Sequence, residues 1–92
     1  MGSGGRAVAY RQVAAATTLT VADHVVGFAS TAAATLPADP YVGQVHVIKS
    51  VGAAVTVTVS AAGKTIDGAA TATVAPWQAL KVLYTGTDWI TI

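Results

Sequence analysis

Cysteine and glutamate are absent from this chain, and charged residues are scarce. Because none of the 92 residues is cysteine, disulfides and thiolate metal sites are excluded. Charged residues make up 10% of the chain, against about 25% in ordinary soluble domains. Hydrophobic residues make up 53%. A single small domain with so little charge exposes an unusually apolar surface, which contact with further copies of the chain would bury.

The charge balance and the hydropathy pattern exclude two classes of partner. The net charge is +1 and no basic cluster occurs, so the electrostatic footprint of a nucleic-acid-binding protein is missing. No apolar run approaches the ~18 residues of a membrane span, and the opening MGSGG lacks the apolar core of a signal peptide. We therefore expect no nucleic acid and no membrane as partners. Residues 1–6 are expected to form a flexible N-terminal tail, and residues 7–92 a single β domain.

Strand patterns run through the chain, and no helical periodicity interrupts them. In residues 54–60 (AVTVTVS), Val55, Val57 and Val59 alternate with polar residues, which predicts a strand with one buried face. Similar segments rich in Val, Thr and aromatic residues predict further strands at residues 8–13, 17–21, 24–30, 32–37, 43–50, 79–85 and 88–92. Short strands at intervals of about 8–12 residues indicate an all-β fold. We expect a small antiparallel β-sandwich or barrel-like domain.

Residues 63–68 (GKTIDG), the most charged stretch, contain a Gly-Lys-Thr typical of phosphate-binding loops. Such a loop also needs an earlier glycine and a following helix, but Thr58 occupies the glycine position and no helical pattern follows. The Asp-Gly pair instead predicts a tight turn, because Asp bonds its own backbone and Gly takes positive φ. The positions assigned to structural turns are Gly63, Asp67, Gly68 and Gly86.

The two histidines are the remaining metal candidates. In residues 43–50, alternation predicts that Val45 and Val47 face the core and that His46 lies on the opposite, polar side. Zinc needs three or four ligands, and neither Cys nor Glu is present to complete a set with His24 or His46. One His per copy near an oligomer axis is left as an alternative, and a histidine bonded to a neighbour is the expected role. We expect no cofactor.

No set of catalytic residues is indicated by the sequence. The acidic residues all fall in predicted turns, and none of the serines lies in a nucleophile elbow. We therefore expect that the protein is not an enzyme. The acidic residues in question are Asp23, Asp39, Asp67 and Asp88.

The aromatic residues offer a second class of function. Trp77 follows Pro76 in a loop and is expected to be exposed, whereas Trp89 lies in the last strand and is expected to be buried. With Tyr41, an exposed Trp77 would supply a stacking surface for sugar rings. The alternative to a structural role is therefore a carbohydrate-binding, receptor-recognition module that contacts host glycans.

An ordered set of short motifs spans roughly residues 17–92. It comprises a strand ending in Leu-Pro, a loop leading to Gly-Gln, a strand with Lys near its end, an alternating Val/Thr strand, a Thr-Ile-Asp-Gly turn and a final Gly-x-x-Trp strand pair. In that order these are residues 36–37, 43–44, Lys49, 55–59, 65–68 and 86–89. The set resembles a β-rich module of bacteriophage virion proteins, which occurs near the C-termini of tail fibres and in head-fibre or capsid-surface proteins.

The resemblance implies a non-enzymatic structural component of the virion, made in the cytoplasm of the bacterial host. It also implies a homotrimer of packed or intertwined subunits, with other capsid or tail proteins as further partners, in attachment or particle stability. A fibre module and a capsid decoration protein both fit it. The connection at residues 49–55 is shorter than the Asp/Asn/Gly-rich one common in the family, which bears on recognition by that loop and not on the fold.

Overall fold

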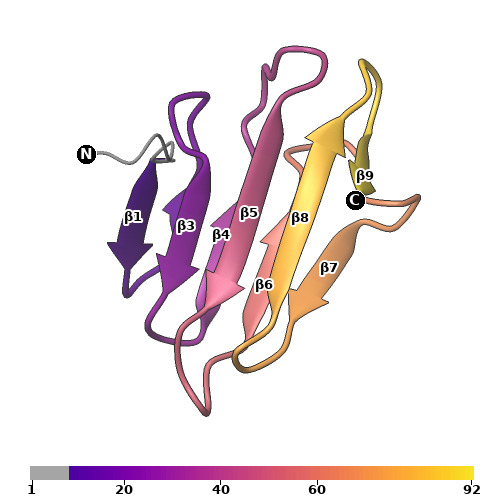
Figure 1. Ribbon diagram of the computed structural model, residues 1–92. Helices are drawn as coiled ribbons and strands as arrows, with labels where there is room; N and C mark the ends of the chain where they lie inside the picture. The colour runs from indigo at the N-terminus through magenta and orange to yellow at the C-terminus, as the bar shows by residue number, and fades with distance from the viewer. Residues whose placement is uncertain (1–8) are drawn as a thin grey trace.

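Nine β-strands form two sheets in the computed structural model, which describes residues 9–92 (Figure 1). The strands are β1 (Tyr10–Val13), β2 (Thr17–Thr18), β3 (Val25–Phe28), β4 (Ala32–Thr35), β5 (Val45–Ser50), β6 (Val57–Ser60), β7 (Thr71–Val74), β8 (Ala79–Tyr84) and β9 (Trp89–Thr91). One sheet has the order β1-β3-β5-β8-β9 and the other β2-β4-β6-β7. Within the described residues, no helix is long and apolar enough to cross a membrane.

The chain alternates between the two sheets over its first six strands. β1, β3 and β5 lie in the five-stranded sheet, and β2, β4 and β6 lie in the four-stranded sheet. Each connection therefore crosses from one sheet to the other, and each return adds a strand parallel to the previous one in that sheet. The first six strands thus form three successive coils, and each coil contributes one strand to each sheet.

This winding corrects the expectation of an antiparallel domain. Four strand pairings are parallel and three are antiparallel. The antiparallel pairs all involve the last part of the chain, where β6 and β7 form one hairpin and β8 and β9 another. Side-chain alternation has the same period in both kinds of pairing, so it does not distinguish them. The expectation of an all-β, two-sheet fold is confirmed.

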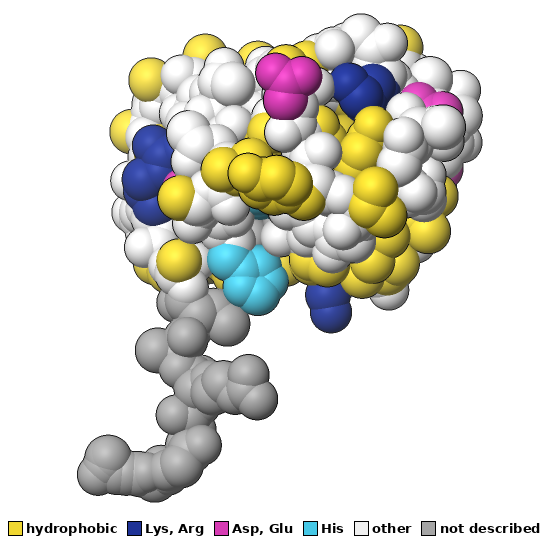
Figure 2. Space-filling view, turned by 90° about the horizontal axis from the view of Figure 1, so that it is seen from above, with side chains coloured by type: hydrophobic (Ala, Val, Ile, Leu, Met, Phe, Trp, Pro, Cys, Tyr) yellow, Lys and Arg dark blue, Asp and Glu magenta, His cyan; other side chains and the backbone are white. Residues whose placement is uncertain are grey.

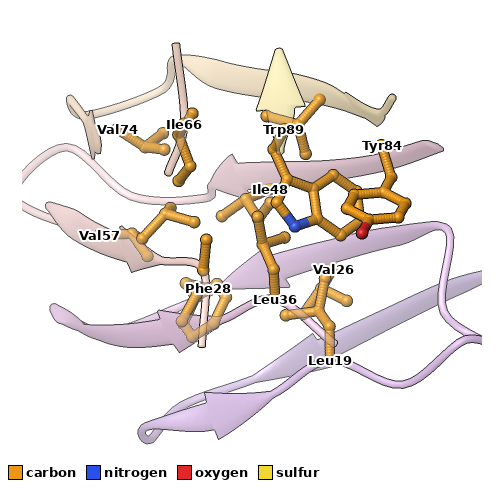
Figure 3. Packing of buried hydrophobic residues seen from close by; sticks show 14 of the residues in the cluster. Leu19, Val26, Phe28, Leu36, Ile48, Val57, Ile66, Val74, Tyr84 and Trp89 are labelled. Atoms are coloured by element: carbon orange, nitrogen blue, oxygen red, sulfur yellow. The ribbon is translucent and has the colours of Figure 1, made fainter. Parts of the chain in front are cut away.

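Buried hydrophobic side chains from both sheets fill the space between them (Figure 3). In the four-stranded sheet, Val57 and Val59 are fully buried and Val55 nearly so, as their alternation predicts. Phe28 and Trp89 are the largest fully buried side chains of the facing sheet. Burying one such side chain contributes about 1.5–3 kcal/mol, so the alternating strands supply most of the stability.

β5 faces the opposite way from its prediction. His46, Ile48 and Ser50 are fully buried, whereas Val45 and Val47 are partly exposed on the outer face. The sequence of this strand is ambiguous, because apolar residues occur on both of its faces. Pairing decides the orientation, because buried residues of β3 and β8 lie in register with His46 and Ile48.

The sequence patterns do not predict β7, and they extend several other strands beyond their observed ends. β7 alternates threonine with Ala72 and Val74, and only Val74 is fully buried. Its strand conformation follows from hairpin pairing with β6, which a weak local pattern does not reveal. The expected tail at residues 1–6 lies outside the described residues.

Ile66 and Ile90 provide a matched test of the core. Ile66 is 2% exposed and Ile90 is 40% exposed. We expect Ile66→Ala to lower the free energy of unfolding by about 2–5 kcal/mol, because it removes buried methyl groups and leaves a cavity. Ile90→Ala should lower it by only about 0.5 kcal/mol. Urea denaturation at one fixed protein concentration measures both, and equal losses would contradict the assigned core.

Candidate functional site

The Asp-Gly pair of residues 63–68 forms a tight two-residue turn. Ile66 and Ala69 exchange two backbone hydrogen bonds, of 2.8 and 2.9 Å. The φ angles of Asp67 and Gly68 between them are 50° and 83°. Positive φ at both central positions defines a type I′ turn, the form in which Asp-Gly is strongly favoured. Backbone geometry therefore accounts for this pair.

Two further turns involve the other glycines assigned from the sequence. Ala62 and Gly63 both have positive φ, 51° and 89°, immediately before Lys64 donates its backbone N–H to the Ala61 carbonyl. Gly86 has a φ of 112° in the β8–β9 hairpin. Each turn therefore contains a residue in the left-handed region that glycine adopts most readily.

The charged side chains of residues 63–68 connect separate segments of the fold. Asp67 accepts hydrogen bonds from the backbone N–H and the hydroxyl of Thr91, and these bonds lower the pKa of Asp67. Lys64 donates to the Ala38 carbonyl at 2.9 Å, and its Nζ lies 5.9 Å from the centroid of the Tyr84 ring. The two side chains thus join the turn to β9 and to the β4–β5 connection.

All four aspartates of the chain lie at one end of the sandwich. They occupy the β2–β3, β4–β5, β6–β7 and β8–β9 connections, which share the upper end in Figure 1. Figure 2 looks onto this end, where acidic side chains surround hydrophobic ones. Within residues 9–92, no three His, Asp or Glu side chains gather as metal ligands, and no cavity opens. The aspartates are Asp23, Asp39, Asp67 and Asp88.

His46 lies in the core rather than on a polar face. Its ring centroid is 5.6 Å from that of Trp89, and its Nε2 is 2.7 Å from the Gln44 side-chain nitrogen. Burial lowers the pKa of His46, the Asp23 charge and backbone oppose the shift, and the His24 charge adds to it. A fully buried side chain does not reach a neighbouring subunit, so this position gives no support to a metal site on an oligomer axis.

The two aromatic residues proposed to contact sugar lie at opposite ends of the molecule. Tyr41 precedes β5, and Trp77 precedes β8, which runs antiparallel to β5. The length of β5, roughly 20 Å, therefore separates them, and they do not form one stacking surface. They are exposed by 72% and 55%, respectively, whereas Trp89 is fully buried.

Trp77 occupies an unusual backbone position. The N–H of Gln78 donates to the Ala75 carbonyl at 2.9 Å, which closes a four-residue turn with Pro76 and Trp77 in its centre. The φ of Trp77 is +60°, and positive φ at this position after proline is the feature of a type II turn, which normally requires glycine. The Lys49 ammonium donates to the Trp77 carbonyl. No sequence pattern predicts this strain, and the Pro-Trp pair in a loop is its only signal.

The outer face of the five-stranded sheet carries aliphatic side chains together with Lys49 and Lys81, and Lys81 lies in register with Val47. Val45, Leu83 and Ile90 lie side by side across three strands, and Val25 pairs with Val47 on the same face. All five are partly or largely exposed, and each neighbours a fully buried residue that points inward. We call these five residues the aliphatic face. The alternation of residues 43–50 does not predict the aliphatic face, because by itself it places Val45 and Val47 in the core.

The outer face of the four-stranded sheet carries hydroxyl groups instead. Register places its side chains in two rows across the strands, without a charged or large apolar residue among them. Within residues 9–92 these hydroxyls take part in no side-chain hydrogen bond, so they are free to bind water. We call this set the hydroxyl face; it consists of Thr18, Thr35, Thr58, Ser60, Thr71 and Thr73.

Comparison with known families agrees with the two-sheet architecture. Residues 3–90 match the phage depolymerase C-terminal beta sandwich domain. The match covers nearly the whole chain, and the protein therefore belongs to this family. It is a phage tail-associated β domain and thus a virion-associated protein. Neither curated proteins nor solved structures give a significant match.

Gly68 offers a test of the type I′ turn that is free of packing effects. A Cβ at Gly68 would meet no atom within 4 Å, so only its φ of +83° opposes substitution. We expect Gly68→Val to lower the free energy of unfolding by about 1–3 kcal/mol, because a β-branched residue is strained at positive φ. Gly68→Asn should be tolerated, because Asn adopts this region more readily. Thermal melts of the two variants test this order; equal melting temperatures would contradict it.

Proposed function

We propose that this domain is a non-enzymatic structural module of the phage tail that assembles as a homotrimer through its aliphatic face. In this proposal the module is made in the host cytoplasm, joins other virion proteins and serves attachment or particle stability. The aliphatic face is the observation that carries the proposal. The family supports the tail assignment, and the assembly and the role in attachment are inferred from the surface.

The contrast between the two outer faces supports self-association. Val and Thr have similar shapes, and both favour strands, so strand propensity does not explain why one face carries Val, Leu and Ile and the other Thr and Ser. Water contact explains the hydroxyl face, and an apolar partner surface explains the aliphatic face. A second copy of the chain brings such a surface, and the row of Val45, Leu83 and Ile90 lies apart from the two lysines of this face.

The surroundings of the charged groups support a structural rather than a catalytic role. Asp67 binds Thr91, Asp88 accepts a hydrogen bond from the Thr65 backbone, and Asp23 forms an ion pair with Arg11. Burial raises the pKa of Asp23, but bonds from Arg11 and Thr20 outweigh it, so its pKa lies below the ordinary value. With a lowered pKa, the Asp23 and Asp67 carboxylates stabilise backbone in their turns and suit neither a general acid nor a base near neutral pH.

Lysine substitutions on the two outer faces test the assembly. We expect light scattering of the wild-type chain at micromolar concentration to give about three times the chain mass. Val45→Lys on the aliphatic face should weaken assembly by roughly 100-fold or more, because it places a charge beside Leu83 and Ile90 in an apolar contact. Thr58→Lys on the hydroxyl face is the matched control and should leave the mass unchanged. A stable wild-type monomer would sink the proposal, and so would equal effects of the two lysines.

The strained turn at Trp77 favours a second candidate, recognition of a host glycan. The turn before β5 has the same hydrogen-bond pattern, from the Gln44 N–H to the Tyr41 carbonyl, and there Gly43 takes the position with positive φ, 85°. At Trp77 the chain instead keeps a large exposed aromatic ring against a backbone preference of about 1–2 kcal/mol. Strained, exposed residues mark binding sites, and a Trp ring stacks on sugars. In this candidate Trp77 acts without Tyr41, which lies at the other end.

Replacing Trp77 by glycine separates binding from folding. We expect Trp77→Gly to be about as stable as the wild type, because relief of the strained φ offsets the added flexibility of glycine. If Trp77 binds glycan, titration calorimetry with polysaccharides from the host surface should show heat for the wild type and none for Trp77→Gly. Tyr41→Ala is the control and should bind normally. Binding that survives in Trp77→Gly would exclude this site.

A further inference from the structure

The turn that carries the two most exposed large hydrophobic side chains of residues 9–92 is joined to Tyr84 of β8 by backbone hydrogen bonds at Gly43 and Gln44, and to the core by one side chain. Tyr41 and Val42 are 72% and 75% exposed, and they begin the turn that leads into β5. The Tyr41 backbone N–H donates to the Gln44 side-chain oxygen at 2.9 Å, and the Gln44 side-chain nitrogen lies 2.7 Å from His46 Nε2. The Gln44 side-chain amide therefore connects the buried His46 ring to the exposed turn at Tyr41.

The direction of these hydrogen bonds follows from their chemistry. A backbone N–H only donates, so the amide oxygen of Gln44 must face Tyr41 and its NH₂ group must face His46. His46 Nε2 is then the acceptor, which requires a neutral ring with its proton on Nδ1. Among the described residues Nδ1 has no hydrogen-bond partner, and the nearby Asp23 backbone raises the pKa of His46 without closing a hydrogen bond. The observed turn is therefore compatible only with unprotonated Nε2.

Protonation of Nε2 would put two donors against each other at this contact. Rotating the Gln44 amide by half a turn would present its oxygen to His46, but it would then place the NH₂ group against the Tyr41 N–H. One of the two hydrogen bonds is lost in either case. We propose that His46 is an acid-sensitive catch for the first half of the turn at residues 41–44. The neutral ring holds the Tyr41 N–H through Gln44, and the protonated ring releases Tyr41 and Val42 while Gly43 stays bonded to β8.

The surroundings of His46 set the pH range of this release. The charged or titratable groups facing it from neighbouring elements are Asp23, which is paired with Arg11, and His24 before β3. On the β8 side Tyr84 packs against Trp89, with Lys64 above its ring. Burial is the largest influence and lowers the pKa of His46 below 6.5. The contribution of the closed turn is therefore complete above about pH 6.5 and is lost as the pH falls through the lower folded-state value.

Amide hydrogen exchange at Tyr41 measures the catch directly in the full chain. By NMR, corrected for intrinsic exchange rates, we expect protection of the Tyr41 amide to fall roughly tenfold between about pH 7.5 and about pH 5. The amide of Val47, which donates to the His24 carbonyl at 2.8 Å, should stay protected, because release of the turn is local. Equal loss at Val47 would mean global unfolding and would overturn the proposal.

Two variants identify the group that responds. Gln44→Glu has the same shape, but its carboxylate accepts from both the Tyr41 N–H and a protonated His46, so protection should persist at acid pH. His24→Gln removes the other histidine and should behave as the wild type. The proposal fails if Tyr41 protection is independent of pH in the wild type. It also fails if Gln44→Glu loses protection as the wild type does, or if His24→Gln abolishes the effect.

Discussion

Burial of Trp89 is the interaction on which the upper end of the sandwich depends. The indole is fully buried and lies beside the Tyr84 ring (Figure 3). The distances between ring centroids are 5.3 Å to Tyr84 and 5.6 Å to His46. Its backbone N–H donates to the Thr65 carbonyl, and its own carbonyl accepts from the Asp67 N–H. One residue thus joins the terminal hairpin of the five-stranded sheet to the long connection of the four-stranded sheet. The bonds from Thr91 to Asp67 and from Thr65 to Asp88 join the same two segments on either side of Trp89.

The same rule of alternation produces two chemically different surfaces. In both sheets the inward positions are mainly apolar, since the core requires it, and His46 and Ser50 are the buried polar ones. The outward positions are free of that requirement, and here they diverge: the four-stranded sheet carries hydroxyls, and the five-stranded sheet carries Val, Leu and Ile beside two lysines. A small domain with a core only two sheets thick gains limited stability from folding alone. An outer face that can be buried against another subunit adds to that stability without a larger chain.

The acidic side chains of this protein are concentrated where the chain turns. The upper connections hold all four aspartates, the type I′ turn and the Gln44 amide, while no strand of residues 9–92 carries an acidic residue. This distribution follows from the winding, because each crossing between sheets exposes backbone groups that no neighbouring strand satisfies. Asp67 and Lys64 fill such gaps by binding Thr91 and the Ala38 carbonyl. His46 lies beneath these connections. The backbone groups around it therefore obtain hydrogen bonds from side chains.

Local features of the fold could be predicted from the sequence, because neighbouring residues decide them. The alternation of Val55, Val57 and Val59 suffices for a strand with a buried face, and the steric freedom of glycine suffices to place a turn. The exposure of Trp77 and the burial of Trp89 likewise follow from a Pro-Trp loop and a strand. The arrangement of the candidate site could not be predicted from the sequence. Tyr41 and Trp77 stand out as aromatic residues, but only the fold shows that the length of β5 separates them.

Long-range pairing was decided only by the tertiary structure. The parallel coils, the orientation of β5 and the strand state of β7 depend on partners far along the chain, and each of these segments tolerates more than one arrangement by its own pattern. Val45 and Val47 are as apolar as a core requires, yet they face outward because His46 and Ile48 align with buried residues of β3 and β8. Local sterics limit each residue to a few conformations, and the choice among them is made by the segments it packs against.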